Sequence, residues 1–543
     1  MDISVNQNSV TEYDYIIIGG GSAGCVAAAR LSANPAKKVL LIEAGGASDV
    51  NHQSSPLRDA SRLVLEGYNW DYTANIRDKH LNIESFTEFK NQLTQNSSSK
   101  KIFNYRLGKV MGGSSAVNGA VALRAFPSDF ALWEQQIGKQ WSWESVLPWY
   151  KQLEHDLDFA EHQLHGSQGP MRLRRPQPEE IHPLDATFAD ISVKQGLNYV
   201  DDLNIGEAPG VGLVPSNVAP NAERIDVYRA YLEPLKSREN LSVITDALVD
   251  KVKLENQQVI GITIKVDDKE YYLQSSEVVL SAGAIGSAAV LQRSGIGDPD
   301  HLGALNIPLN QALPGVGKNL QDHSSLVVWS VPKPGVCQSG MPWRQFATRS
   351  QSGVDQQTDI QIGLLNSIDS TTVPGFQDIA HPALVGISVM LMRPQARGKI
   401  SIQSTNPQQR PLIYLPIAQD QQDILRMVAG VRNIWQTLQA PTIRQYLQET
   451  LFWSETIINN DKVMQTVVSN LINPGWHASG TLKMGRKEDP DAVTDENGCV
   501  HGINGLTVLD ASVFPAIPSM PTNLTTIMVA EKLSDQLIQR SQS

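Results

Sequence analysis

The sequence predicts an α/β protein, α+β overall, in which a second domain on a mostly antiparallel sheet interrupts a Rossmann-like domain. An apolar run, Ile16–Ile18, leads into Gly19-x-Gly21-x-x-Gly24 and then into a small-residue, helix-like stretch. Residues 37–46, KKVLLIEAGG, are typical of a second buried strand, and residues 277–297 repeat the order of strand, small-residue turn and helix. These patterns predict a parallel sheet assembled from distant segments.

The first glycine-rich turn has the layout of a site for an adenine dinucleotide. Gly19 allows a tight turn, Gly21 lets the backbone approach a pyrophosphate, and Gly24 lets the helix pack on the strand. Glu43 lies 43 − 24 = 19 positions after Gly24, close to the spacing of about 20 expected for an acid that binds a ribose. The helix N-terminus would hold the pyrophosphate. The alternative is a glycine-rich turn in an ordinary α/β protein.

Composition narrows the class of protein. A chain of 543 residues is too long for one core, so two or more domains are expected. The net charge of −11 and the lack of a basic run argue against nucleic acid or an anionic membrane as the main partner. Three distant cysteines without a CxxC pair argue against a disulfide framework or a metal site. Neither a signal peptide nor a membrane span is recognisable, so a cytoplasmic location is expected.

Five segments are expected along the chain. Residues 10–155, 221–329 and 471–543 are expected to form the dinucleotide-binding domain. Residues 330–470, with strand candidates such as ISVMLMRP followed by a helical stretch, are expected to form the substrate-binding domain. Residues 156–220 are expected to be a loop-rich excursion, and residues 47–104 to be polar and irregular.

Several motifs in order resemble the glucose–methanol–choline (GMC) oxidoreductases, which bind FAD. They are GGGSAG at 19–24, EAGG at 43–46, GKVMGGSSAVNG at 108–119, PGVGKNLQDH at 314–323, HASGT at 477–481, LDASVFP at 509–515 and TNLTTIMVAEK at 522–532. The resemblance runs from about residue 13 to residue 536 and is greatest to members that oxidise hydroxymethylfurfural and aryl alcohols. Met111 and Ala288 depart from the family pattern without removing a chemical group.

The resemblance implies that His477 and Asn523 are the catalytic pair. An imidazole with a pKa near neutrality suits removal of the hydroxyl proton. A neutral amide beside it suits the oxygen as negative charge develops there. Asn523 is also a good capping residue for the helix that follows it.

The resemblance also implies the residues that hold FAD. The amides of Leu524, Thr525 and Thr526 are expected near the flavin pyrimidine ring, and Val117 stands where some relatives carry a histidine that links covalently to FAD. Non-covalent FAD is therefore expected. The implied contacts are Gly19, Gly21, Ser22, Ala23, Gly24, Glu43, Ala44, Trp70, Met111, Gly113, Ser114, Asn118, Gly119, Val249, Ala282, Gly283, Trp476, Asp510, Ala511, Leu524 and Thr525.

Two further residues are open to more than one interpretation. Trp476 either walls the substrate pocket or packs in the core. Asp510 either contacts FAD or caps a helix. His323 and Arg393 are expected to be structural.

The function expected from these motifs is oxidation of a primary alcohol to an aldehyde, and through the hydrated aldehyde to an acid. O2 or a quinone would accept the electrons. The alternatives are a choline-type dehydrogenase, which would need an aromatic cage and a carboxylate, a light-driven fatty acid decarboxylase, and a flavoprotein without turnover.

Overall fold

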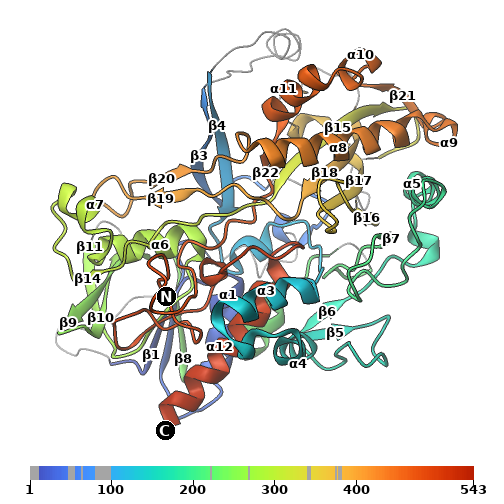
Figure 1. The fold of residues 1–543 in the computed structure, drawn as a ribbon. Helices are drawn as coiled ribbons and strands as arrows, with labels where there is room; N and C mark the ends of the chain where they lie inside the picture. The colour runs from blue at the N-terminus through green and yellow to red at the C-terminus, as the bar shows by residue number, and fades with distance from the viewer. Residues whose placement is uncertain are drawn as a thin grey trace.

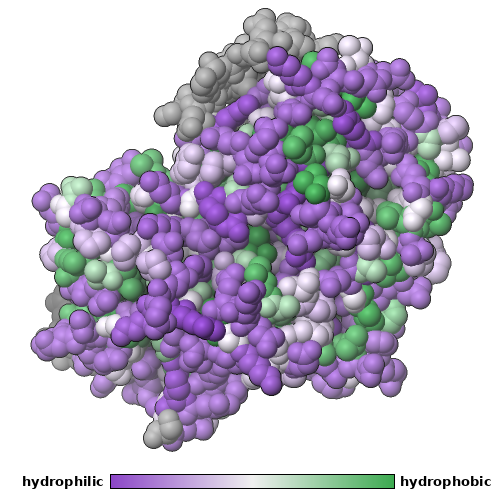
Figure 2. All heavy atoms as spheres, in the orientation of Figure 1, coloured by the Kyte–Doolittle hydropathy of each residue, from purple (hydrophilic) through white to green (hydrophobic). Residues whose placement is uncertain are grey.

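The structure is a computed structural model that describes residues 12–46, 55–62, 65–79, 99–220, 223–266, 269–338, 344–373, 376 and 382–542. Figure 1 shows a parallel-sheet region near the N-terminus and a second region in which a larger sheet lies beneath helices α8 and α11. On the face drawn in Figure 2 the surface is mainly hydrophilic, with hydrophobic residues in small separate groups. Among the described helices, none combines the length and apolarity needed to cross a bilayer.

A five-stranded parallel sheet forms the centre of the first domain. Its order is β23 (Leu506–Val508), β12 (Val278–Leu280), β1 (Tyr15–Ile18), β2 (Val39–Ile42) and β8 (Leu241–Ile244). Ile18 is in register with both Ile42 and Leu280, so β1, β2 and β12 end together. This edge carries the glycine-rich turn, Glu43 and the turn before α6, as expected for a ligand site in an open α/β sheet. The predicted fold class is confirmed.

Two helices far apart in the sequence meet at this edge. α1 (Ser22–Leu31) packs against α12 (Asn523–Gln542). Arg30 forms a 2.6 Å ion pair with the buried Glu531, which also accepts a 2.7 Å hydrogen bond from the hydroxyl of Tyr231. The Oγ of Ser22, the first residue of α1, donates to Oδ1 of Asn523, the first residue of α12, at 3.0 Å. The N-termini of both helices therefore face the same space.

The second domain is built on an antiparallel sheet. Its order is β21 (Leu447–Thr450), β15 (Ser324–Pro332), β18 (Ala383–Leu391), β17 (Ile360–Asp369), β16 (Phe346–Ser350) and β7 (Gly210–Leu213), with β22 (Asn473–Pro474) also paired to β15. α8 (Gln421–Gln439) packs on β15, β17 and β18, and α11 (Asp461–Leu471) packs on α8. β7 belongs to the segment 156–220, which thus contributes a strand to this sheet.

The expectation that residues 47–104 are irregular is wrong for residues 69–79 and 99–104. β3 (Asn69–Lys79) and β4 (Ser99–Gly108) form a long antiparallel ribbon that projects from the molecule (Figure 1). Tyr72, Ala74 and Ile76 are buried, whereas Asp71 and Thr73 are exposed, which is the alternation of a half-buried strand. β20 (Leu412–Tyr414) and β19 (Lys399–Ser401) extend this sheet.

The remaining elements surround these sheets. They are α3 (Pro127–Ile137), α4 (Trp143–Leu153), α5 (Pro183–Lys194), α6 (Gly283–Arg293), α7 (Pro299–Ala304), α9 (Pro441–Arg444), α10 (Glu455–Ile458), β5 (Glu154–Asp156), β6 (Met171–Leu173), β9 (Leu248–Glu255), β10 (Gln258–Val266), β11 (Lys269–Gln274), β13 (Ile296–Gly297) and β14 (Gln311–Ala312).

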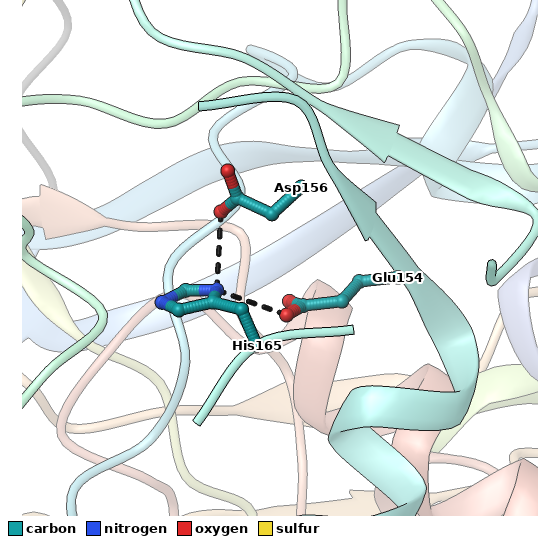
Figure 3. A group of neighbouring side chains, drawn as sticks. All are labelled: Glu154, Asp156 and His165. Carbon is teal, nitrogen blue, oxygen red and sulfur yellow. Dashed lines mark hydrogen bonds and ion pairs between the residues drawn. The ribbon is translucent and has the colours of Figure 1, made fainter. Parts of the chain in front are cut away.

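A buried charge cluster lies at the end of α4 and holds the segment that follows it. Figure 3 shows His165 between Glu154 and Asp156, with its Nδ1 3.0 Å from a Glu154 oxygen and 3.1 Å from an Asp156 oxygen. Its Nε2 lies 2.7 Å from Asp202. Burial disfavours charge on His165, but its hydrogen bonds to Asp156, Asp202 and Glu154 outweigh that effect and raise its pKa to about 10.

Although these side chains are of metal-ligand type, their charges already balance one another. Arg124 is ion-paired with Glu154, and Arg175 contacts Asp156 at 2.9 Å and Asp202 at 2.5 Å. Two guanidinium groups and one imidazolium therefore face three buried carboxylates, and Arg175 also lies 3.4 Å from the half-buried Asp158. The cluster is thus an ion-pair network within the protein, and such buried networks are strongly destabilised when one member is removed.

We predict that His165→Gln lowers the unfolding temperature of the protein most at or below about pH 6.5. A raised histidine pKa stabilises the fold fully below the unfolded value of about 6.5, and that contribution is lost as pH rises towards about 10. The difference from wild type in thermal unfolding should therefore shrink between about pH 7 and pH 10. His155→Gln, on β5, is the matched control. A difference that stays constant with pH would contradict a charged His165.

Candidate active site

One cavity of about 1540 Å³ joins the two domains. It is larger than the roughly 300–1,000 Å³ typical of a site for one small ligand. It extends from the ends of the parallel strands to the antiparallel sheet. The residues expected at the site that line it are Gly19, Gly21, Ser22, Ala23, Glu43, Ala44, Trp70, Gly113, Ser114, Asn118, Gly119, Val249, Ala282, Gly283, Trp476, His477, Asp510, Ala511 and Asn523.

Four of the expected contacts do not line the cavity. Gly24 faces the strand, where a Cβ would lie 1.8 Å from the carbonyl oxygen of Gly19. Met111 is buried beneath the glycine turn, and Leu524 is buried within the first turn of α12. Thr525 is also buried, with its hydroxyl 2.7 Å from the hydroxyl of Tyr150. These four residues pack behind the residues that line the cavity.

The glycine-rich turn leaves an open surface at Gly21. A Cβ on Gly21 would meet nothing nearer than the Cα of Gly113, at 3.8 Å. Gly21 directly precedes α1, so the free N–H groups of that helix face the same opening. This is a suitable cradle for an anionic pyrophosphate.

Glu43 is held rigidly at the end of β2. Its two carboxylate oxygens accept backbone N–H groups, from Gly20 at 2.7 Å and from Gly45 at 2.8 Å. Burial raises its pKa to about 7, against the lowering effect of those N–H groups and of Lys109. The carboxyl group also lines the cavity, where a ribose hydroxyl would reach it.

The loop after β4 is fixed by a buried arginine. Arg224 donates to the backbone carbonyl oxygens of Asn118 and, at 3.0 Å, Leu57. The Oγ of Ser114 accepts a 3.1 Å hydrogen bond from the N–H of Gly108. Val117, in the same loop, lines the cavity.

Asp510 connects two elements at the cavity wall. Its Oδ2 accepts the N–H of Gly283 at 2.8 Å and the hydroxyl of Ser287 at 2.5 Å, which holds the start of α6. Its Oδ1 accepts the N–H of Ser512 at 2.8 Å and so caps the short helix Ala511–Val513. The capping interpretation thus has direct contacts in the structure, and Asp510 also lines the cavity.

His477 lies deep in the cavity, at the junction of the two domains. Its backbone N–H donates to Oδ1 of Asp322 at 2.9 Å, and the other oxygen of Asp322 accepts the hydroxyl of Tyr105. Burial, together with the positive charge of Arg344, lowers the pKa of His477 to about 4. The imidazole is therefore neutral at physiological pH, and one of its two ring nitrogens carries no proton.

His323, for which a structural role is expected, contacts His477 directly. The two Nδ1 atoms are 2.8 Å apart, and the rings meet edge to face with their centroids at 5.0 Å. The two histidines are 154 positions apart, and sequence motifs did not signal their contact. Arg393 differs, because its contacts with Asp129 at 3.4 Å and with Ser128 at 2.6 Å are structural.

Asn523 offers a second polar group to the cavity. Its Oδ1 accepts the hydroxyl of Ser22, whereas its Nδ2 is buried and has no hydrogen-bond partner among the described residues. A buried amide donor needs an acceptor, and an oxygen bound in the cavity would supply one. Since α12 begins at Asn523 itself, the residue before it, Thr522, occupies the cap position.

The substrate side of the cavity is largely apolar. Trp476 is 46% exposed, lines the cavity and packs against Phe103 with ring centroids 6.0 Å apart, so it is not a core residue. Its backbone is left-handed, with φ of +61°, a strained conformation often found at functional sites. The other lining side chains on this side include Leu326, Trp329, Arg344, Leu365, Phe376, Met390 and Trp453.

These features fit FAD as the resident group. The open face of Gly21, the buried Glu43 carboxyl and the paired helix N-termini suit an adenine dinucleotide. The Nδ2 of Asn523, which has no hydrogen-bond partner in the described part of the chain, and the neutral imidazole of His477 border the same cavity at its other end.

Comparisons with known proteins agree with this geometry. Residues 13–325 and 394–530 match the N-terminal and C-terminal family models of the GMC oxidoreductases. The chain is 31% identical to the 5-(hydroxymethyl)furfural oxidase of Methylovorus sp. (strain MP688), over 97% of this chain and 99% of that protein. It is 32% identical to the oxygen-dependent choline dehydrogenase of Yersinia pseudotuberculosis serotype O:1b (strain IP 31758), over 97% and 94% of the two chains.

The fold has close counterparts among solved structures. Pyridoxine 4-oxidase from Mesorbium loti matches with a TM-score of 0.85 and 26% identity, over 97% of this chain and 99% of that one. The chain therefore belongs to the GMC oxidoreductase family, whose members are FAD-dependent oxidoreductases acting on CH–OH groups.

Proposed function

We propose that this protein oxidises a primary alcohol of aryl or furan type, such as hydroxymethylfurfural, to the aldehyde and, through the hydrated aldehyde, to the acid. FAD bound in the cavity would accept the hydride of the alcohol carbon at N5. The observation that supports this most is a neutral imidazole and an unpartnered amide donor bordering one apolar cavity. O2 or a quinone would receive the electrons.

The chain's own residues supply the proton chemistry and the orientation. His477 takes the hydroxyl proton, for which it must be unprotonated, and its low pKa keeps it so. Asn523 donates its Nδ2–H to the alcohol oxygen as negative charge develops there. Trp476 and Phe103 offer aromatic faces to an aryl or furan ring.

Non-covalent binding of FAD is part of the proposal. Val117 has no nucleophilic atom, although it lines the cavity at the position where a linking histidine would stand. The dinucleotide would be held by Gly21, the start of α1 and Glu43. Release of free FAD on denaturation tests this point.

The charge of the cavity separates the proposed substrate from choline. Among the described residues of the 325–477 segment that line the cavity, the ionisable side chains are Arg344, Arg410 and His477, and none is a carboxylate. Arg344 exerts its positive charge on His477 itself. A quaternary ammonium group placed beside that cation would be repelled.

We predict that His477→Ala retains FAD but reduces flavin about 10²-fold or more slowly, as expected for loss of a general base. The measurement is anaerobic stopped-flow bleaching of the flavin by hydroxymethylfurfural or benzyl alcohol. In the wild type this rate should stay constant above about pH 5 and fall as His477 is protonated with a pKa of about 4. Readmitting air would then distinguish an oxidase from a dehydrogenase. Unchanged reduction in the variant would remove His477 from its role.

We predict that Asn523→Asp slows flavin reduction by about 10²-fold, the loss typical of one oxyanion donor. Aspartate has nearly the same shape and keeps an acceptor for Ser22, but it replaces the donor with a second acceptor. The loss should appear in kcat more than in KM, because the interaction grows as charge develops. A loss confined to KM would indicate that Asn523 only binds the substrate.

We predict that neutral benzyl alcohol exceeds choline in kcat/KM by more than tenfold, and that Arg344→Met narrows this ratio. The variant should also raise the pKa of the acid limb of flavin reduction, since the positive charge of Arg344 lowers the pKa of His477. Arg344→Lys, which keeps the charge, is the control. Efficient choline oxidation by the wild type would favour the choline-type alternative.

A further inference from the structure

A continuous hydrogen-bond chain leads from a backbone carbonyl to the proposed base. The Nε2 of His323 lies 2.9 Å from the carbonyl oxygen of Pro518, and the Nδ1 of His323 lies 2.8 Å from the Nδ1 of His477. A carbonyl oxygen only accepts, so the proton on that side belongs to His323 Nε2. In a neutral ring Nδ1 then carries the lone pair, and the proton between the two histidines belongs to His477.

We propose that His323 is a positioning residue that fixes His477 as the Nδ1–H tautomer and so presents Nε2 as the unprotonated atom that accepts the alcohol proton. This inference rests on the proposed function, in which His477 is the base. His323 itself touches neither substrate nor cofactor in this scheme. It acts through the ring of His477 alone.

The surroundings of His323 keep it neutral. The side chain is fully buried. Burial, followed by the charge of His477, lowers its pKa well below the usual range, against the opposing carbonyl groups of Pro518 and Met392. The charged or titratable groups around the pair are Asp322 and Tyr105 on the backbone side of His477 and Arg344 on the cavity side. A neutral acceptor orients His477 without raising its pKa. A carboxylate in the same place would raise that pKa.

The backbone fixes the geometry of the two rings. Gln321 and Ser479 exchange two 3.0 Å hydrogen bonds, and the N–H of Gly475 donates to the carbonyl of His323 at 2.7 Å. These hydrogen bonds join the segment that carries His323 to the segment that carries His477. A Cβ on Gly475 would lie 3.3 Å from the Nδ1 of His477, so a glycine leaves room for the ring pair.

Two substitutions separate orientation from mere packing. Asparagine can place its Oδ1 close to the Nδ1 position of histidine and still accept from His477, whereas leucine cannot accept. We expect His323→Leu to slow anaerobic flavin reduction by about 10²-fold, the scale of a misoriented catalytic group, and His323→Asn to restore most of the rate. The absorbance of bound FAD and thermal unfolding report folding, and His155→Gln is the control.

A spectroscopic readout tests the tautomer without turnover. In protein labelled with ¹⁵N-histidine, assigned against His477→Ala, His477 should show a protonated Nδ1 and an unprotonated Nε2 in the wild type and in His323→Asn. His323→Leu should show a mixture. A protonated Nε2 in the wild type would overturn the proposal, and this outcome does not depend on the stability of any variant. Shifts of His477 that are the same in His323→Leu as in the wild type would also overturn it. Normal reduction by His477→Ala would overturn the proposed function and leave the tautomer measurement standing.

Discussion

The site depends on the hydrogen bond between Ser22 and Asn523, which joins the first residues of two helices 501 positions apart. It brings the glycine-rich turn, which begins α1, against the residue that begins α12. The ion pair between the partly exposed Arg30 and the buried Glu531 holds the same two helices together further along. Each helix N-terminus carries a partial positive charge, so the space between the starts of α1 and α12 favours an anionic group. The side-chain amide of Asn523 lies at the edge of this space.

The second domain supplies the other half of the site, and it too brings together segments that are distant in the sequence. β15 begins at Ser324, directly after His323, and pairs with β22 just before His477. The strand pairing therefore determines how the two imidazoles face each other. The proposed base, His477, is thus oriented by the antiparallel sheet, whereas the glycine-rich turn and Glu43 are oriented by the parallel one. The cavity between them is where those two frameworks meet.

Local patterns in the sequence predicted the parallel sheet and the glycine-rich part of the cavity wall, because each glycine and each buried strand carries its own signal. The β3–β4 ribbon was missed although Tyr72, Ala74 and Ile76 alternate with polar residues, since the polar face dominates the composition of that stretch. The contact between His323 and His477 was not predicted either, for a different reason. The role that we propose for His323 depends on a contact across 154 positions and on the carbonyl of Pro518, and no spacing within the chain encodes either.

The low pKa of His477 constrains how the proposed reaction proceeds. An alcohol with a pKa close to that of water, about 15.7, would lose its proton to a base of pKa about 4 at a cost of about 16 kcal/mol. That nearly equals the whole barrier that a typical turnover of about 10 s⁻¹ allows. A free alkoxide is therefore not an intermediate of the proposed reaction. Either the O–H proton leaves as the C–H bond breaks, or Asn523 and Arg344 stabilise the negative charge on the oxygen while it develops. In both cases the electrostatic environment of the oxygen contributes more than the strength of the base.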